Sequence, residues 1–218
     1  MQHEMTHQVV PRVVSVNVGE IREVGWRGTR VTTAIWKSSV NRRVMVQGVN
    51  LDGDAQADRT VHGGEYKAVY AYAMEDYEFW AESEGIALQA GLFGENLTVC
   101  GLDLRTSLVG ERWSIGTAAL EVTQPRLPCF KLGIRMNDPL FPKRFTSAGR
   151  PGAYLRIIEP GFVGAGDEVR VVSRPSHTVT LASMMYALSD RTARPALRAA
   201  RELPPFWRRV AFGQIDEE

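Results

Sequence analysis

Short strand-like runs separated by turns dominate the first two-thirds of this 218-residue chain. Residues 13–18, 29–35 and 68–72 are rich in β-branched and aromatic side chains, which strands prefer. A hairpin is expected where residues 112–115 and 119–123 flank Gly116-Thr117. Many short strands with frequent turns are typical of a closed barrel or a sandwich. The pattern therefore predicts an α+β fold that is mainly β.

A few helices are expected among these strands. One helix should run from Met74 through Glu84, before Gly85 ends it. A second, shorter helix is expected over residues 138–147. A glycine-rich turn is expected at residues 161–166, between two further strands.

The pattern changes after Arg174-Pro175-Ser176, where three short helices are expected at residues 181–188, 191–201 and 204–212. We therefore predict an N-terminal tail (1–12), a β-barrel domain (13–175) and a small all-α three-helix domain (176–218).

The net charge of +1 gives no support to a nucleic acid polymer or a membrane surface as the main partner. No apolar run approaches the roughly 20 residues that a membrane span needs. Two cysteines imply no disulfide framework, and the first residues lack an apolar signal segment, so a cytoplasmic location is expected. A phosphate-binding Gly-x-x-x-x-Gly-Lys loop, a His-Glu-x-x-His zinc motif and a Gly-x-Ser-x-Gly elbow are all missing.

Cys129 lies in the run Gln-Pro-Arg-Leu-Pro-Cys-Phe-Lys-Leu, where two prolines precede it and two cations, Arg126 and Lys131, flank it. Nearby positive charge favours the thiolate, and the prolines hold the approach extended. A helix that opens after Pro128 would add to that effect. The alternative is a small buried cysteine with no chemical role.

Two polar stretches are further candidates for a binding site. In residues 52–67, Gly63 and Gly64 allow close backbone approach to a ligand, and His62 and Lys67 add a titratable ring and a cation. In residues 91–97, Asn96 can both donate to and accept from the edge of a heterocycle. For each stretch taken alone, a tight turn with an exposed or capping side chain is the commoner explanation.

Taken together, three stretches resemble the MOSC domain, named for the C-terminal domain of molybdenum cofactor sulfurase. They are Asp58–Gly64 with the following Lys-Ala-Val-Tyr, Phe93–Leu97, and the cysteine run. Their order is similar to that of the YiiM-like branch, in which a three-helix domain follows a MOSC β-barrel.

The resemblance implies a protein that binds molybdenum cofactor (molybdopterin with molybdenum), with Cys129 as the protein ligand to the metal. It implies an enzyme that reduces N-hydroxylated compounds such as N-hydroxylated bases. By position, the implied cofactor-side residues are His62, Gly63, Gly64, Lys67, Asn96, Arg126, Lys131 and Arg150. His62 is also a candidate for proton delivery, because its pKa is ordinarily near neutrality.

No cysteine set for an iron–sulfur cluster and no flavin motif is present, so a separate electron-donating reductase is expected, with the basic tail as its docking surface. A homodimer is expected only because it is the commonest assembly. Two alternatives stay open: a sulfur carrier or transferase with a Cys129 persulfide, and a non-catalytic carrier of molybdenum cofactor.

Overall fold

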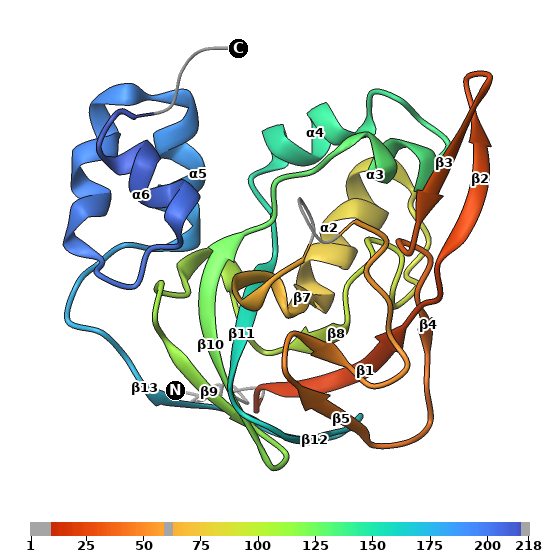
Figure 1. Ribbon diagram of the computed structural model, residues 1–218, viewed down its shortest axis with the longest axis horizontal. Coiled ribbons are helices and arrows are strands. Elements are labelled where there is room, and N and C mark those ends of the chain that lie inside the picture. The colour runs from red at the N-terminus through yellow and green to blue at the C-terminus, as the bar shows by residue number, and fades with distance from the viewer. Residues whose placement is uncertain (1–9, 59–62, 215–218) are drawn as a thin grey trace, which may run out of the picture.

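A computed structural model describes residues 10–58 and 63–214 (Figure 1). Its main sheet has eight strands in the order β13-β9-β10-β11-β7-β8-β1-β4. They are β1 (Arg12–Val18), β4 (Ser38–Ser39), β7 (Val69–Ala73), β8 (Leu97–Cys100), β9 (Arg112–Ile115), β10 (Ala118–Pro125), β11 (Ala153–Glu159) and β13 (Val169–Ser173). Neighbours are antiparallel except β7 and β8, which are parallel.

Backbone hydrogen bonds close this sheet on itself. The amide of Val13 in β1 donates to the carbonyl of Asp167 at 2.8 Å, and the amide of Gly166 donates back to Val13 at 2.8 Å. Val13 and Val16 of β1 are almost fully buried inside. The mainly β fold with several helices is therefore confirmed.

Two small sheets flank the main one. One joins β5 (Val44–Gln47), β6 (Asn50–Leu51) and β12 (Gly161–Val163), and the other is a projecting hairpin of β2 (Arg22–Trp26) and β3 (Thr29–Thr33) (Figure 1). Strand β12 occupies part of the segment for which we expected only a turn. A Cβ at Gly161 would lie 2.3 Å from the Thr117 carbonyl oxygen, so glycine is needed for this close approach.

Three helices cover one side of the sheet: α2 (Met74–Glu84), α3 (Phe130–Arg135) and α4 (Phe141–Ala148). Helix α2 has the predicted bounds, and Gly85 ends it with φ 66°. Helix α4 begins three residues later than predicted, with Pro142 in its first turn. These helices share an aromatic core with β7, built on Tyr72, Trp80, Phe93, Phe141 and Phe145. Short 3₁₀ helices η1 (Glu65–Lys67) and η2 (Leu104–Thr106) complete this part.

The C-terminal tail consists of α5 (Leu181–Ser189), η3 (Arg191–Ala199) and α6 (Pro205–Ala211). The middle segment is a 3₁₀ helix that contains Pro195, which removes a donor that an α-helix needs. Leu197, Trp207 and Val210 are buried in the same hydrophobic cluster as the barrel. An independent three-helix domain stays a prediction, because the tail shares its core with the rest of the chain.

Among the described residues, no helix is long and apolar enough to cross a membrane.

Candidate functional site

Cys129 lies where strand β10 gives way to helix α3. The chain leaves β10 at Pro125 and stays extended through Cys129, which has φ −119° and ψ 174°. Cys129 is the N-cap of α3, so the helix expected after Pro128 is present. Its thiol is free and half-buried. Because prolines precede it, the backbone holds the thiol in one place.

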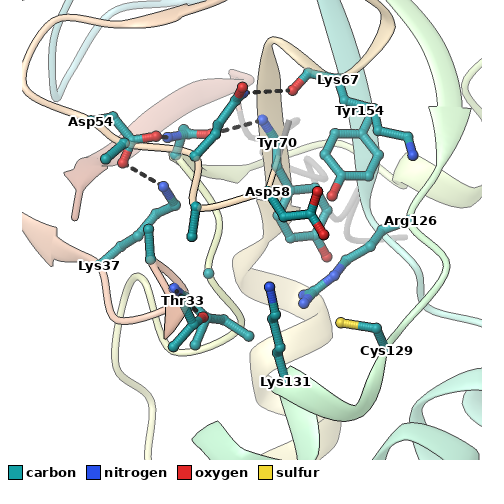
Figure 2. Close-up of a pocket in the computed structure, with 17 residues that line it drawn as sticks. Thr33, Lys37, Asp54, Asp58, Lys67, Tyr70, Arg126, Cys129, Lys131 and Tyr154 are labelled. Carbon is teal, nitrogen blue, oxygen red and sulfur yellow. Dashed lines mark hydrogen bonds and ion pairs between the residues drawn. The ribbon is translucent and has the colours of Figure 1, made fainter. Parts of the chain in front are cut away.

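The cysteine faces a cavity at one end of the barrel, with Lys67, Arg126 and Lys131 in the same wall (Figure 2). Lys67 is the last residue of η1, and Arg126 and Lys131 flank the cysteine along the chain. The sequence therefore predicted four residues that the fold brings together. Tyr154 of β11 also lines the cavity beside them.

Cations in this wall interact electrostatically with Cys129. Burial lowers the pKa of Lys67, and the nearby Cys129 acts in the opposite direction. Burial also raises the pKa of Tyr154, and Arg126 opposes that shift. These groups give the cavity a positive end that suits a phosphate or another anion.

Arg126 is buried, with 6% of its surface exposed. Its Nη1 donates to the carbonyl of Phe93, and its guanidinium lies 5.0 Å from the centre of the Tyr70 ring and 5.8 Å from that of Phe145. Burial acts to lower its pKa, but Coulombic interactions, first with Tyr70 and Tyr154, raise it above the usual value. Arg126 is therefore a fixed positive charge in the cavity wall.

Asn96 lines the same cavity, but its carboxamide already has protein partners. Its Oδ1 accepts from the Tyr70 amide at 3.1 Å, and its Nδ2 donates to Asp54 at 3.0 Å and to the Asn17 carbonyl at 3.4 Å. Asp54 in turn is ion-paired with the buried amine of Lys37. Asn96 thus joins three segments of the cavity wall.

Glu95, next to Asn96, is fully buried and organises the loop before β8. Its Oε1 accepts from the Tyr77 hydroxyl at 2.6 Å, the Gly91 amide at 2.6 Å and the Thr98 hydroxyl at 2.8 Å. Burial raises the pKa of Glu95, although these donors oppose the shift. Glu95 therefore supports, through buried hydrogen bonds, the loop that places Asn96 in the cavity wall.

Arg150 does not line this cavity or the one beside it. Its Nη1 donates to Asp76 at 2.6 Å, and its guanidinium lies 4.2 Å from the centre of the Phe79 ring. Burial raises the pKa of Asp76, and the hydrogen bond from Arg150 opposes that effect. The structure therefore gives Arg150 a partner on α2 rather than a place in the site.

His62 lies outside the described residues. Gly63 and Gly64 line a second cavity that Cys129 also borders. Gly64 has φ 89°, a conformation that glycine adopts readily. The glycine pair thus lies where a ligand next to Cys129 would meet the backbone.

Several residues of the first cavity were not singled out as site residues in the sequence, among them Lys37, Asp54, Gln56 and Asp58. Gln56 donates to the carbonyls of Val49 and Lys67, both at 3.3 Å, but its Oε1 is buried and has no hydrogen-bond partner among the described residues. An unsatisfied buried acceptor of this kind suits a ligand that brings its own N–H group. Three of the four, Asp54, Gln56 and Asp58, lie in the polar run 52–58, and that run was their only signal in the sequence.

The second cavity has a different wall. It encloses about 640 Å³ and shares Cys129, Lys67 and Tyr154 with the first. Its other lining residues come from η1, the end of β10 and the tail: Gly63, Gly64, Glu65, Tyr66, Gln124, Pro125, Leu127, Pro128, Pro204, Pro205 and Phe206. The described residues contain no group of three or more His, Cys, Asp or Glu side chains that could hold a metal alone.

Comparison with known proteins identifies the family. Residues 58–170 match the family model for the MOSC domain. "Uncharacterized protein YflK" of Bacillus subtilis (strain 168) is 36% identical over 162 residues, which cover 74% of this chain and 73% of that protein. A protein named "Reductase" from Gibberella moniliformis is 32% identical over 167 residues, which cover 75% of this chain but 29% of the fungal protein.

The fold agrees with these sequence matches. The crystal structure of YiiM from Geobacillus stearothermophilus superposes with a TM-score of 0.76 and 28% identity, covering 94% of this chain and 100% of the other. All three stretches that carry the resemblance contribute residues to the walls around Cys129. The chain belongs to the MOSC domain family, and YiiM proteins are among its homologues.

Proposed function

We propose that this protein binds molybdenum cofactor, with Cys129 as the protein ligand to the metal, and reduces N-hydroxylated compounds. The observation that carries the proposal is the half-buried free thiol of Cys129 in the wall of a cationic cavity (Figure 2). Membership of the MOSC family and the fungal relative named "Reductase" support it.

The residues around the cavity fit such a cofactor. A thiolate is a soft ligand that suits a metal already held by sulfur atoms. Lys67, Lys131 and Arg126 suit a phosphate, and the unsatisfied Oε1 of Gln56 suits an N–H group of a pterin. When bound, the cofactor supplies a metal centre that can pass two electrons to a substrate.

The overall reaction takes two electrons and two protons, breaks the N–O bond and releases water. Lys67 is a candidate to hold a proton at this point, because it borders both cavities and burial lowers the pKa of its amine. His62 remains a second candidate. A separate redox protein would supply the electrons, since the chain has only two cysteines and so cannot hold a four-cysteine cluster.

Elemental analysis of paired variants tests the metal ligand. Protein from a host that makes the cofactor should contain molybdenum in the wild type and in Cys100→Ser, and Cys129→Ser should lose most of it. Cys100 is the matched control, because it is also free and half-buried but lies at the end of β8. Equal molybdenum in Cys129→Ser and Cys100→Ser would reject Cys129 as the ligand.

The same preparations separate the alternatives. Cyanide-releasable sulfur on Cys129 without molybdenum would indicate a sulfur carrier. Molybdenum and pterin that pass rapidly to a cofactor-free acceptor enzyme, with no reduction of N-hydroxylated compounds, would indicate a cofactor carrier.

A further inference from the structure

The two cavities that meet at Cys129 differ in chemistry. The first contains most of the cations and the polar groups, including Lys131, Arg126 and Gln56. The second is walled by three segments that supply prolines, Leu127 and the rings of Tyr66 and Phe206, and its polar side chains include Glu65, Lys67 and Gln124. A phosphate group suits the first, because only there do several cations converge. The second suits an uncharged flat ring.

From this difference we propose that the second cavity binds the ring of an aromatic or heteroaromatic N-hydroxylated substrate, and that Phe206 in the tail is a specificity-determining residue. This inference rests on the proposed function for its chemistry. Cys129, Lys67 and Tyr154 line both cavities, so a ring in the second cavity would lie beside the residue that would hold the metal.

Hydrogen bonds hold the three walls of this cavity together. Trp207 Nε1 of α6 donates to Gln124 Oε1 at 3.0 Å, and Gln124 Nε2 donates to the Tyr66 carbonyl at 3.2 Å. The Thr123 hydroxyl donates to the same carbonyl at 2.6 Å. The tail, β10 and η1 are therefore fixed relative to one another, as a pocket that selects by shape requires.

Phe206 is positioned by its neighbours on the tail. Pro204 and Pro205 begin α6 and line the cavity with it. The Phe206 ring packs edge-on against Trp207, with 5.4 Å between ring centres. It is only partly buried, which leaves a face for a ligand. A planar ligand that stacks there would also change the surroundings of the Trp207 indole.

Kinetics with substrates of two sizes test the role of Phe206. In Phe206→Ala, KM for an N-hydroxylated purine should rise about tenfold through loss of one ring contact, while kcat and the KM for hydroxylamine should change little. Phe206→Leu should fall between wild type and Phe206→Ala. Phe212→Ala is the control, because Phe212 is an exposed tail phenylalanine that does not line the cavity. Equal KM values for the purine in Phe206→Ala, Phe206→Leu and Phe212→Ala would overturn the proposal.

Binding to cofactor-free protein gives a second readout that needs no turnover. Adenine, which lacks the N–O group, should shift the Trp207 indole signal in a proton–nitrogen NMR spectrum, and less so in Phe206→Ala. No shift in the wild type would overturn the substrate cavity even if molybdenum is found. A shift in a protein that never holds molybdenum would keep the ring site and reject the proposed reductase.

Discussion

Trp207→Phe tests how much the buried hydrogen bond between Trp207 and Gln124 contributes to holding the tail against the barrel. The Trp207 side chain is fully buried and Gln124 is 5% exposed, so the change leaves the Gln124 oxygen without its donor. An unsatisfied buried acceptor costs about 1–3 kcal/mol, and the smaller ring adds about 1 kcal/mol of lost packing. The free energy of unfolding should therefore fall by about 2–4 kcal/mol, which lowers Tm by about 5–15 °C in a protein of this size.

Urea and thermal unfolding measure this effect, and Trp26→Phe is the control. Trp26 lies on the projecting β2–β3 hairpin, so its variant should differ from wild type by less than about 0.5 kcal/mol. The double variant Trp207→Phe/Gln124→Leu should lose less free energy of unfolding than the two single variants lose together. The difference should be at least about 0.5 kcal/mol, because the double variant has no Gln124 oxygen left without a donor. Additive losses, or a Trp207→Phe variant as stable as its control, would refute the link.

The same unfolding curves test the predicted domain boundary. A tail that shares the barrel's core should unfold with it in one transition, seen equally by circular dichroism and tryptophan fluorescence. Two resolved transitions would instead show that residues 176–218 form a domain of their own.

Three further predictions concern charged residues. Lys131→Met should lower the pterin content per chain at least severalfold, because it removes a cation from the cavity wall. Lys143→Met, on the exposed face of α4, should leave the pterin content unchanged. Equal pterin contents in the two variants would show that Lys131 is not part of the site. Arg150→Met should lower Tm through loss of its ion pair with Asp76 and leave pterin content per folded chain intact, and a specific loss of pterin would restore Arg150 as a phosphate ligand. Burial raises the pKa of Glu95 above 4.5, so its contribution to stability is complete below that pH and is lost as the pH rises toward the folded value. Glu95→Gln should therefore flatten the decline in stability above about pH 4.5 in urea unfolding; a parallel decline in both proteins would contradict the assignment.

The cysteine run shows which structural features neighbouring residues alone can predict. Two prolines restrict the backbone on either side of Arg126 and Leu127, so the extended approach and the helix that opens at Phe130 could be predicted from neighbours alone. Helix α2 was predictable to the residue for the same reason, since its period and the terminal Gly85 are local signals. That Lys67 shares a cavity with Cys129 was implied by family resemblance, and the fold agrees with it.

Other features depend on contacts between distant segments. Asn96 and Arg150 carry the donors that a cofactor needs, but their partners Tyr70, Asp54 and Asp76 lie more than 25 residues away along the chain. The spacing of residues in the sequence does not predict such long-range hydrogen bonds. Polar residues that face a ligand could therefore not be distinguished from those that support the cavity wall.

The amino-acid order alone was enough for the mainly β class, the principal helix and the choice of Cys129 as the candidate thiol, because each depends on short-range periodicity, backbone restriction or a motif. Folding in three dimensions settled the rest. It brought the tail against β10, and it placed beside Cys129 one cavity rich in cations and a second one lined largely by prolines and aromatic rings. It also paired Arg150 with Asp76 of α2. These outcomes follow from burial and long-range hydrogen bonding, which depend on the whole chain at once.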